Sequence, residues 1–172
     1  MYAEKIRGPM QTVVVRPANI YGPDDDFEWE KSHVLPALIR KAVERHDPIE
    51  VWGDGHDVKD FIFIDDFIEG MLSAMEKIET FEPINIATGV PCSVRQALEA
   101  ILKAADYADA EIVFNSSRPT MIPTRLIDAT RAKELLGFEA GTPLAEGIGK
   151  TVDWYKRTHK VAKQTADCPS VV

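Results

Sequence analysis

Apolar residues along the chain repeat at two spacings, and each spacing predicts one kind of element. Continuous apolar or β-branched runs, such as 12–15 and 61–64, are typical of strands buried on both faces. Apolar residues that recur every three to four positions predict helices with one buried face. We therefore expect strands at 12–15, 49–52, 61–64, 83–87 and 111–114, and helices at 33–45, 66–75, 94–105, 128–136 and 144–158.

Several of these helices carry residues that mark their ends. Ser93 and Gln96 have the spacing of a capping box, and Gly137 is expected to end the helix before it. Asp65 or Asp66 is expected to cap a further helix. One face of that helix gathers large apolar side chains: Phe67, Ile68, Met71, Leu72 and Met75.

The order of the elements favours an α/β protein, because strands and helices alternate along the chain. The opening is unusual, since residues 1–7 resemble the last turns of a helix and the strand at 12–15 follows without the neighbours that it would pair with. As an unpaired apolar edge, that strand leads us to expect an oligomeric or marginally stable chain. Residues 161–172 have little apolar content and are expected to form a flexible tail.

Composition and charge exclude several classes of protein. Of the 172 residues 45% are hydrophobic and 28% charged, which is a globular composition and not a disordered or collagen-like one. The net charge of −8 and pI near 5.0 argue against nucleic-acid and membrane-surface binding. The two cysteines, Cys92 and Cys168, make no disulfide framework, and no apolar run approaches the length of a membrane span. We expect a soluble, reduced, cytoplasmic protein.

A turn after the first strand is the first stretch that could bind a ligand. In RPANIYGP, residues 16–23, Pro17 makes the turn rigid, and Asn19 can both donate and accept hydrogen bonds. Ligands of open α/β sheets bind beyond the carboxyl ends of strands. An ordinary strand-ending turn explains the same pattern.

Two further stretches combine cations with aromatic or proline residues. Between residues 51 and 66, Trp52 could stack on a ring and Lys59 could hold a phosphate; a Gly-rich hairpin with a solvated lysine is the simpler interpretation. In the loop that follows residue 116, Arg118 and Arg125 suit phosphate contacts. Salt bridges to some of the 28 acidic residues explain them equally well.

His33 is the candidate for proton exchange, because it follows Ser32 at the start of a helix and an imidazole titrates near neutrality. A surface histidine at a helix end is the common alternative. The other histidines share no metal-ligand spacing with it, so no metal site is predicted.

Taken together and in this order, these stretches resemble the C-terminal half of extended short-chain dehydrogenase/reductases that act on nucleotide sugars, the NAD-dependent epimerase/dehydratase family. The matching motifs are RPANIYGP, VWGDGHDVKDFIFIDD, NIATG, RPTMIPTRLIDATRAKELLGF and LAEGIGKTVDWY. Within the family the chain is most similar to GDP-L-fucose synthases, because its SHVLPAL helix follows an acidic loop as it does there. The resemblance implies the last part of a Rossmann-like parallel sheet (1–23) followed by a smaller α/β substrate-binding domain (to 160).

The resemblance also implies roles for individual residues. Four residues match the segment beside the nicotinamide of NADP or NAD: Pro17, Ala18, Asn19 and Ile20. His33 matches the family's acid. Four residues match positions that contact the nucleotide sugar, with a GDP-sugar favoured: Lys41, Trp52, Lys59 and Arg125. The family further implies that the parent enzyme is a homodimer.

Departures from the family pattern limit what the chain can do. Lys59 stands where the family has Arg, and Thr120 stands where a substrate-contacting Asp is expected. The Gly-x-x-Gly-x-x-Gly motif that holds the cofactor and the catalytic Tyr-x-x-x-Lys pair are both missing from the sequence. Met1 therefore resembles an internal position of a longer enzyme, and the cofactor would be bound mainly by a missing N-terminal part.

The first hypothesis is that the chain is the substrate-binding part of a nucleotide-sugar epimerase/reductase and is inactive alone, with its contribution being the positioning of the sugar. A different NDP-sugar epimerase or dehydratase remains an alternative. Another alternative is a non-catalytic nucleotide-sugar-binding or protein-docking module. A third is an error of gene prediction that placed the start codon inside a longer enzyme.

Overall fold

A computed structural model describes residues 12–118 and 122–159 of the chain. Its strands are β1 (Val14–Pro17), β2 (Asn19–Tyr21), β3 (Ile49–Trp52), β4 (Val58–Lys59), β5 (Phe61–Phe63), β6 (Pro83–Ile86), β7 (Cys92–Ser93), β8 (Ile112–Asn115) and β9 (Thr124–Arg125). Its helices are α1 (Val34–Val43), α2 (Ile64–Lys77), α3 (Val94–Ala105), α4 (Thr130–Leu136) and α5 (Leu144–Thr158). The helix end expected at residues 1–7 and the tail expected at 161–172 lie outside the described residues.

Most strands pair in parallel with a strand that is distant in sequence. β1 pairs with β6, β2 with β5, and β3 with β8, all in parallel. β4 lies between β7, which is antiparallel, and β9, which is parallel. Parallel neighbours need a crossover between them, and helices supply most of these crossovers, as expected for an α/β protein.

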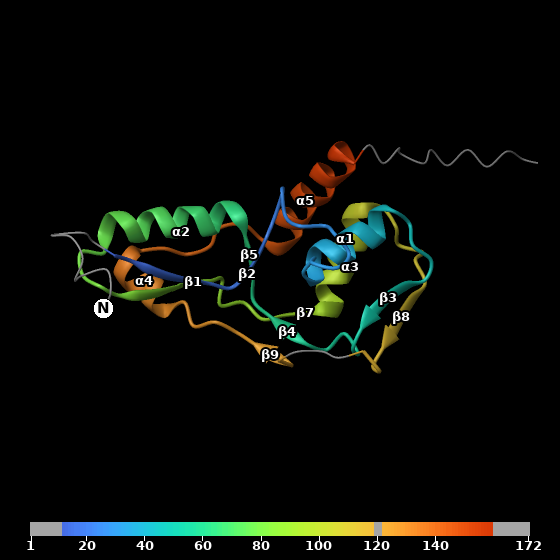
Figure 1. Cartoon of the computed structure of the whole chain (residues 1–172), viewed down its shortest axis with the longest axis horizontal. Helices are drawn as coiled ribbons and strands as arrows, with labels where there is room; N and C mark the ends of the chain where they lie inside the picture. Colours follow the sequence, from blue (N-terminus) through green and yellow to red (C-terminus); the bar gives the residue numbers. More distant parts are fainter. Residues whose placement is uncertain (1–11, 119–121, 160–172) are drawn as a thin grey trace, which may run out of the picture.

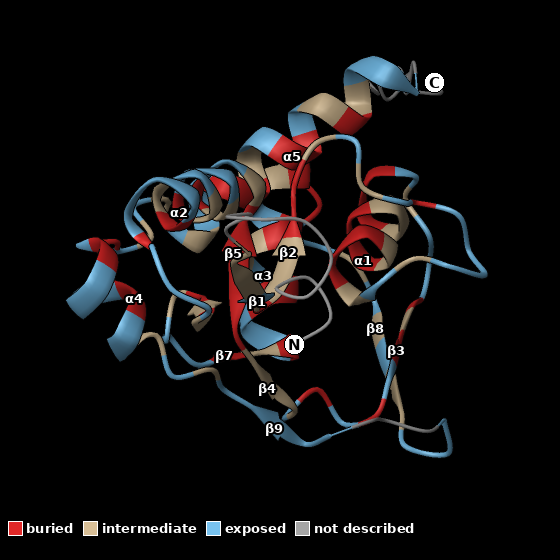
Figure 2. Ribbon diagram, turned by 60° about the vertical axis from the view of Figure 1, so that its left-hand side comes forward, coloured by how far each residue is buried: buried red, intermediate tan, exposed pale blue. Residues whose placement is uncertain are grey.

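The core is divided into two hydrophobic clusters along the long axis of the molecule (Figure 1). The larger cluster joins α1, α3 and α5 with β3 and β5, and Figure 2 shows buried residues along the facing sides of these helices. The smaller cluster joins β1, β6, α2 and α4. β5 separates the two, because Phe61 and Phe63 belong to the larger cluster and Ile62, on the opposite face of the strand, to the smaller one.

The predicted helix ends are mostly confirmed. Ser93 accepts a hydrogen bond from the backbone N–H of Gln96, and the Gln96 side chain accepts one from the Ser93 N–H, so the capping box is present. Gly137 ends α4 in the left-handed conformation, with φ 65°. None of the helices in the described ranges is long and apolar enough to cross a bilayer.

Two expectations about the smaller cluster are wrong. Neither Asp65 nor Asp66 caps α2, which begins at Ile64; Asp66 is instead buried and accepts hydrogen bonds from the backbone N–H groups of Gly141 and Thr142. The strand at the start of the chain is half-buried and not buried on both faces, and β6 pairs with one of its edges. No other described strand pairs with β1.

Candidate functional site

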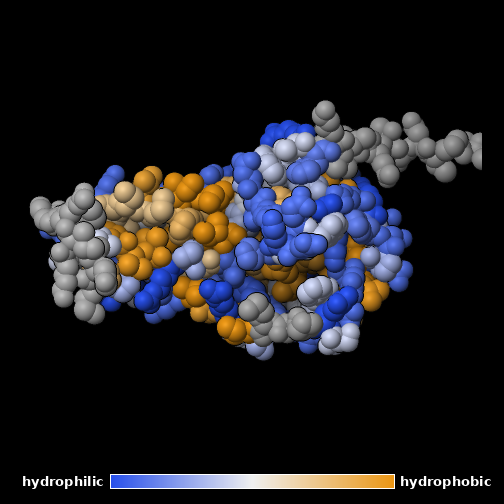
Figure 3. Space-filling model, viewed as in Figure 1, coloured by the Kyte–Doolittle hydropathy of each residue, from blue (hydrophilic) through white to orange (hydrophobic). Residues whose placement is uncertain are grey.

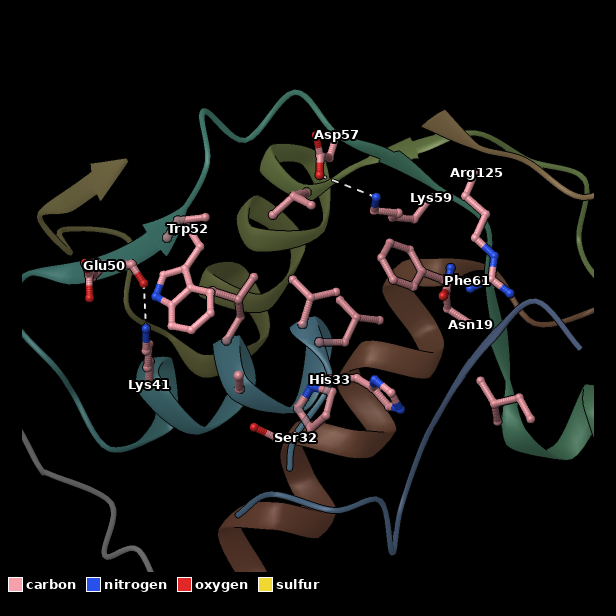
Figure 4. Close-up of a pocket in the computed structure, with 18 of the residues that line it drawn as sticks. Asn19, Ser32, His33, Lys41, Glu50, Trp52, Asp57, Lys59, Phe61 and Arg125 are labelled. Carbon is pink, nitrogen blue, oxygen red and sulfur yellow. Dashed lines mark hydrogen bonds and ion pairs between the residues drawn. The ribbon is translucent and has the colours of Figure 1, made fainter. Parts of the chain in front are cut away.

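A cavity of about 380 Å³ opens between α1, β3, β4 and β9 (Figure 4). This is within the range of small-molecule sites. It contains most of the residues that the sequence singled out, contributed by five different elements: Asn19, Ile20, His33, Lys41, Trp52, Lys59 and Arg125. Figure 4 shows the labelled side chains around one shared space.

A second cavity of about 420 Å³ adjoins the first. The four residues that match the family's nicotinamide segment, Pro17 to Ile20, all line it. Asn19, Ile20, His33 and Arg125 line both cavities. A ligand in one cavity can therefore meet a ligand in the other beside His33 and Arg125.

Two cations lie side by side on the wall of the first cavity. Parallel pairing of β4 with β9 makes Lys59 and Arg125 register partners. Like charges on neighbouring strands repel one another. The Lys59 ammonium group lies 3.4 Å from the carboxylate of Asp57 and donates a hydrogen bond to the carbonyl oxygen of Ile122. Arg125 is exposed. In an acidic chain this pair is suited to an anion that both cations contact.

Asn19 is fixed by the buried residue Asp60. The backbone N–H and the side-chain amide of Asn19 both donate to the carbonyl oxygen of Asp60, at 3.0 and 2.7 Å. The Asp60 carboxylate, which is fully buried, accepts hydrogen bonds from the Thr88 N–H and hydroxyl and from the Gly89 N–H. Asp60 therefore links Asn19, at the start of β2, to Thr88 and Gly89 in the turn after β6. The side-chain oxygen of Asn19 has no hydrogen bond within the described residues.

His33 stands at the N-cap position of α1 but does not cap the helix with its side chain. Its ring is exposed and lies at the junction of the two cavities. An exposed histidine at a helix end is what the common alternative for His33 describes, and both interpretations fit this position. The ring is therefore accessible to a group bound in either cavity.

The opposite end of the first cavity is aromatic. Trp52 is 54% exposed, and the Arg118 guanidinium lies 5.2 Å from its ring centre. Arg118 makes no ion pair within residues 12–118 and 122–159, and its phosphate contact stays a prediction. Lys41 donates to the backbone oxygen of Glu50 at 2.6 Å, and burial lowers the pKa of its ammonium group. An exposed indole beside cations is a suitable surface for a flat ring.

Some residues of the site were missed by the sequence analysis. Asp57 lies two residues before Lys59 on an extended segment, so the period of a strand places both on one side; that spacing was a usable signal. Asp25 and Ser32 each have a buried side-chain oxygen without a hydrogen-bond partner, and each lines one of the cavities. Orphaned buried oxygens are rare and mark functional sites or bound water. Thr120 lies outside the described residues.

Tyr21 cannot replace the tyrosine of the missing Tyr-x-x-x-Lys pair. Its hydroxyl donates to the Leu144 carbonyl at 3.4 Å, and burial raises its pKa far above the usual range. A phenol that holds its proton so firmly is a poor acid–base catalyst near neutral pH.

Burial also raises the pKa of Asp25 above its ordinary value of 3.8, against the opposing effects of the Asp26 N–H and of the His33 charge. A carboxyl group with a raised pKa stabilises the fold while it is protonated. This contribution is full below the unfolded-state pKa and is lost as the pH rises through the folded-state pKa. Asp25 therefore favours the folded state in acid and loses that effect toward neutral pH.

The Asp25→Asn variant is expected to gain stability relative to wild type as the pH rises from below 3.8 toward neutrality, because asparagine cannot ionise. Urea titrations at a series of pH values measure the difference. Asp24→Asn removes the same charge from an exposed neighbour and is the control. Equal pH dependence of the two variants would contradict the burial of Asp25.

No group of metal-ligating side chains occurs within residues 12–118 and 122–159. Cys92 is a buried free thiol, and Cys168 lies outside the described residues.

Comparison with known proteins places this chain in a family. The family model for the NAD dependent epimerase/dehydratase family matches residues 2–87. The chain is 34% identical to GDP-L-fucose synthase of Escherichia coli K12 over 154 residues, covering 82% of this chain and 47% of that protein. It is 33% identical to a dTDP-4-dehydro-6-deoxy-D-allose reductase of a Streptomyces species, covering 86% and 44%.

A solved structure gives the same result for the fold. UDP-glucose 4-epimerase of Thermotoga maritima, solved with UDP-glucose, has a TM-score of 0.78 and 31% identity, covering 86% of this chain and 46% of that one. The α/β fold related to a Rossmann-like sheet is therefore confirmed. The chain spans about half the length of the curated relatives that it matches.

Proposed function

The chain belongs to the NAD dependent epimerase/dehydratase family, and on this premise we propose that it is the substrate-binding part of a nucleotide-sugar epimerase/reductase of the GDP-L-fucose synthase type. The observation that carries the proposal is the register pair Lys59–Arg125, which puts two cations on the wall of a cavity also lined by Asn19, His33 and Trp52. A diphosphate is the anion that such a pair would hold, and a nucleotide sugar has a flat ring on one side of its diphosphate and a sugar on the other.

The layout of the cavity supports one orientation of this substrate. Trp52 is at the end remote from the second cavity and would contact the base. Lys59 and Arg125 would bind the diphosphate, with Lys41 contributing positive charge nearby. The sugar would then lie beside His33 and Asn19, where the two cavities meet.

The second cavity fits only one end of a nicotinamide cofactor. Pro17, Ala18, Ile20 and Ile64 give part of its wall an apolar surface suited to the flat face of a nicotinamide ring. The sequence has no Gly-x-x-Gly-x-x-Gly motif. It therefore lacks the glycine-rich turn whose backbone N–H groups would bind the pyrophosphate of the cofactor. When bound, NADP or NAD supplies or accepts a hydride at a sugar carbon.

The chain's own residues would orient the substrate and move a proton. His33, as imidazolium, would donate a proton to a sugar atom at the junction of the cavities, or as imidazole would accept one. Asn19, held by Asp60, would accept a hydrogen bond from a sugar hydroxyl through its free side-chain oxygen. Fixing the sugar in this way lowers the entropic part of the barrier to reaction.

The Arg125→Ala variant is expected to bind nucleotide sugars about tenfold or more weakly than wild type, because a charge-assisted contact to the diphosphate is lost. Isothermal calorimetry with GDP-, UDP- and dTDP-sugars measures this, and we expect the GDP-sugar to bind most tightly. Arg157→Ala removes the same charge from the exposed end of α5 and is the control. Equal affinities for the two variants, or no binding of any nucleotide sugar, would refute the proposal.

Nucleotide-sugar binding without chemistry is a second candidate. It is favoured by the missing Tyr-x-x-x-Lys pair and by the burial of Tyr21. Both candidates predict that the isolated chain transfers no hydride. They differ in whether a complementary polypeptide restores the reaction.

A further inference from the structure

Two of the three tryptophans in the chain line the first cavity. One is Trp52 on β3, and the other is Trp29, from the acidic loop between β2 and α1. Trp29 lies between the RPANIYGP motif and the SHVLPAL helix and belongs to neither. It is 45% exposed, although tryptophan is highly buried on average. A half-exposed indole on the wall of a ligand-sized cavity is a candidate ligand contact.

Both tryptophans belong to the same end of the first cavity. Trp29 contacts the C-terminal part of α1, where the Arg40 guanidinium lies 4.1 Å from the centre of its ring. Lys41, on the same part of α1, donates to the backbone oxygen of Glu50, two residues before Trp52 (Figure 4). Neither indole lines the second cavity. Trp29 is therefore at the end of the cavity where the base of the nucleotide sugar is expected.

The contacts of Trp29 fix its position. The Arg40 guanidinium that lies over the ring also donates to the Phe27 carbonyl oxygen at 2.9 Å and forms an ion pair with Glu44 at 3.0 Å. The ring of His46 contacts the same indole, with the ring centres 5.4 Å apart. An aromatic surface that is already fixed costs a ligand little ordering entropy. Trp29 thus presents a fixed surface that is still available to a ligand.

The surroundings of Trp29 suit a small polar ligand better than an apolar protein partner. Figure 3 shows hydrophilic residues over much of the end of the molecule that contains α1 and β3, whereas hydrophobic residues gather around α2. Glu28, Glu30 and Lys31, beside Trp29 on the loop, are all exposed. An apolar partner that covered the indole would also remove these charges from water, which is costly. A nucleotide base stacks through its face and keeps polar atoms at its edge, so it fits such a polar rim.

We propose that Trp29 is a specificity-determining residue of the nucleotide-sugar site: together with Trp52 it forms an aromatic surface that favours a purine base over a pyrimidine. Stacking on an aromatic side chain becomes more favourable as more ring area is buried. A purine has two fused rings and a pyrimidine has one, so a second indole adds more to the binding of a purine. This inference rests on the proposed function, because it adds one contact to the same substrate.

The test measures binding of GDP-glucose and UDP-glucose, which differ only in the base, to the full 172-residue chain by isothermal calorimetry. Trp29→Ala should bind GDP-glucose about tenfold more weakly than wild type, and UDP-glucose at most about threefold more weakly. Phe81→Ala removes an aromatic residue that is 51% exposed and lines neither cavity, so it is the control and should leave both affinities unchanged. An equal loss for the two nucleotide sugars, or no loss for GDP-glucose, would overturn the proposal.

A second measurement on the wild-type chain covers the case in which Trp29→Ala fails to fold. Photolabelling with an azido-substituted GDP, read by peptide mass, should modify the peptide that contains Trp29 as well as the one that contains Trp52. Modification of the Trp52 peptide alone, or of neither, would overturn the inference. If the wild-type chain binds no nucleotide sugar, the proposed function fails and the inference fails with it. If wild type and Trp29→Ala bind GDP-glucose equally well, only the inference fails.

Discussion

Replacing Asp60 by alanine is expected to lower the free energy of unfolding by about 3–4 kcal/mol, a large share of the roughly 5–15 kcal/mol of a typical domain. The substitution removes a fully buried carboxylate from three part-buried donors: the N–H and hydroxyl of Thr88 and the N–H of Gly89. Urea unfolding followed by circular dichroism measures the change.

Two further variants make this prediction specific. Asp60→Asn keeps the shape and one accepting oxygen but turns an amide toward the Gly89 N–H, so an intermediate loss of about 1–2 kcal/mol is expected. Asp153→Ala, an exposed position on α5, should change stability by less than about 0.5 kcal/mol. If Asp60→Ala were no more harmful than Asp153→Ala, the hydrogen bonds to the turn after β6 would have no energetic importance, and the anchoring of Asn19 would need another explanation.

Replacing Gly147 by alanine is expected to destabilise the fold by about 1–3 kcal/mol through overpacking. A Cβ at this buried position of α5 would lie 2.2 Å from the Tyr21 hydroxyl oxygen and 2.9 Å from Phe63. The helix can approach β2 and β5 this closely only because glycine has no side chain. Since Tyr21 lines the second cavity, the same change should disturb the ligand site.

Gly149 provides a matched control on the same helix, because a Cβ there would meet nothing within 4 Å. Gly149→Ala should therefore stabilise the chain by up to about 1 kcal/mol, the gain in helix propensity. Thermal unfolding of the two variants should give melting temperatures on opposite sides of wild type. A loss of stability in both would mean that α5 needs glycine for a reason other than its packing against Tyr21.

Residues that line the first cavity could be selected one by one from the sequence, but their pairing in space could not. The sequence indicated Lys59 and Arg125 separately, each with an ordinary explanation. Only the parallel pairing of β4 with β9 makes them neighbours, and strands as short as two residues leave no periodicity in a sequence. The same reason accounts for Asp25, whose acidic loop resembles any solvated loop until its carboxylate oxygen is found to be buried.

Local patterns by themselves determined the helices and the longer strands of this protein, including the capping box at Ser93 and the full extent of α5. They could do so because helix periodicity and capping depend on residues close together in the chain. The tertiary structure alone decided which faces are covered. The large apolar residues of α2 point outward, and Asp66 is buried beneath the loop that leads into α5. Lys59 and Arg125, far apart in sequence, lie side by side on the wall of the first cavity. Burial and strand pairing depend on segments far apart in sequence, so no local pattern contains them.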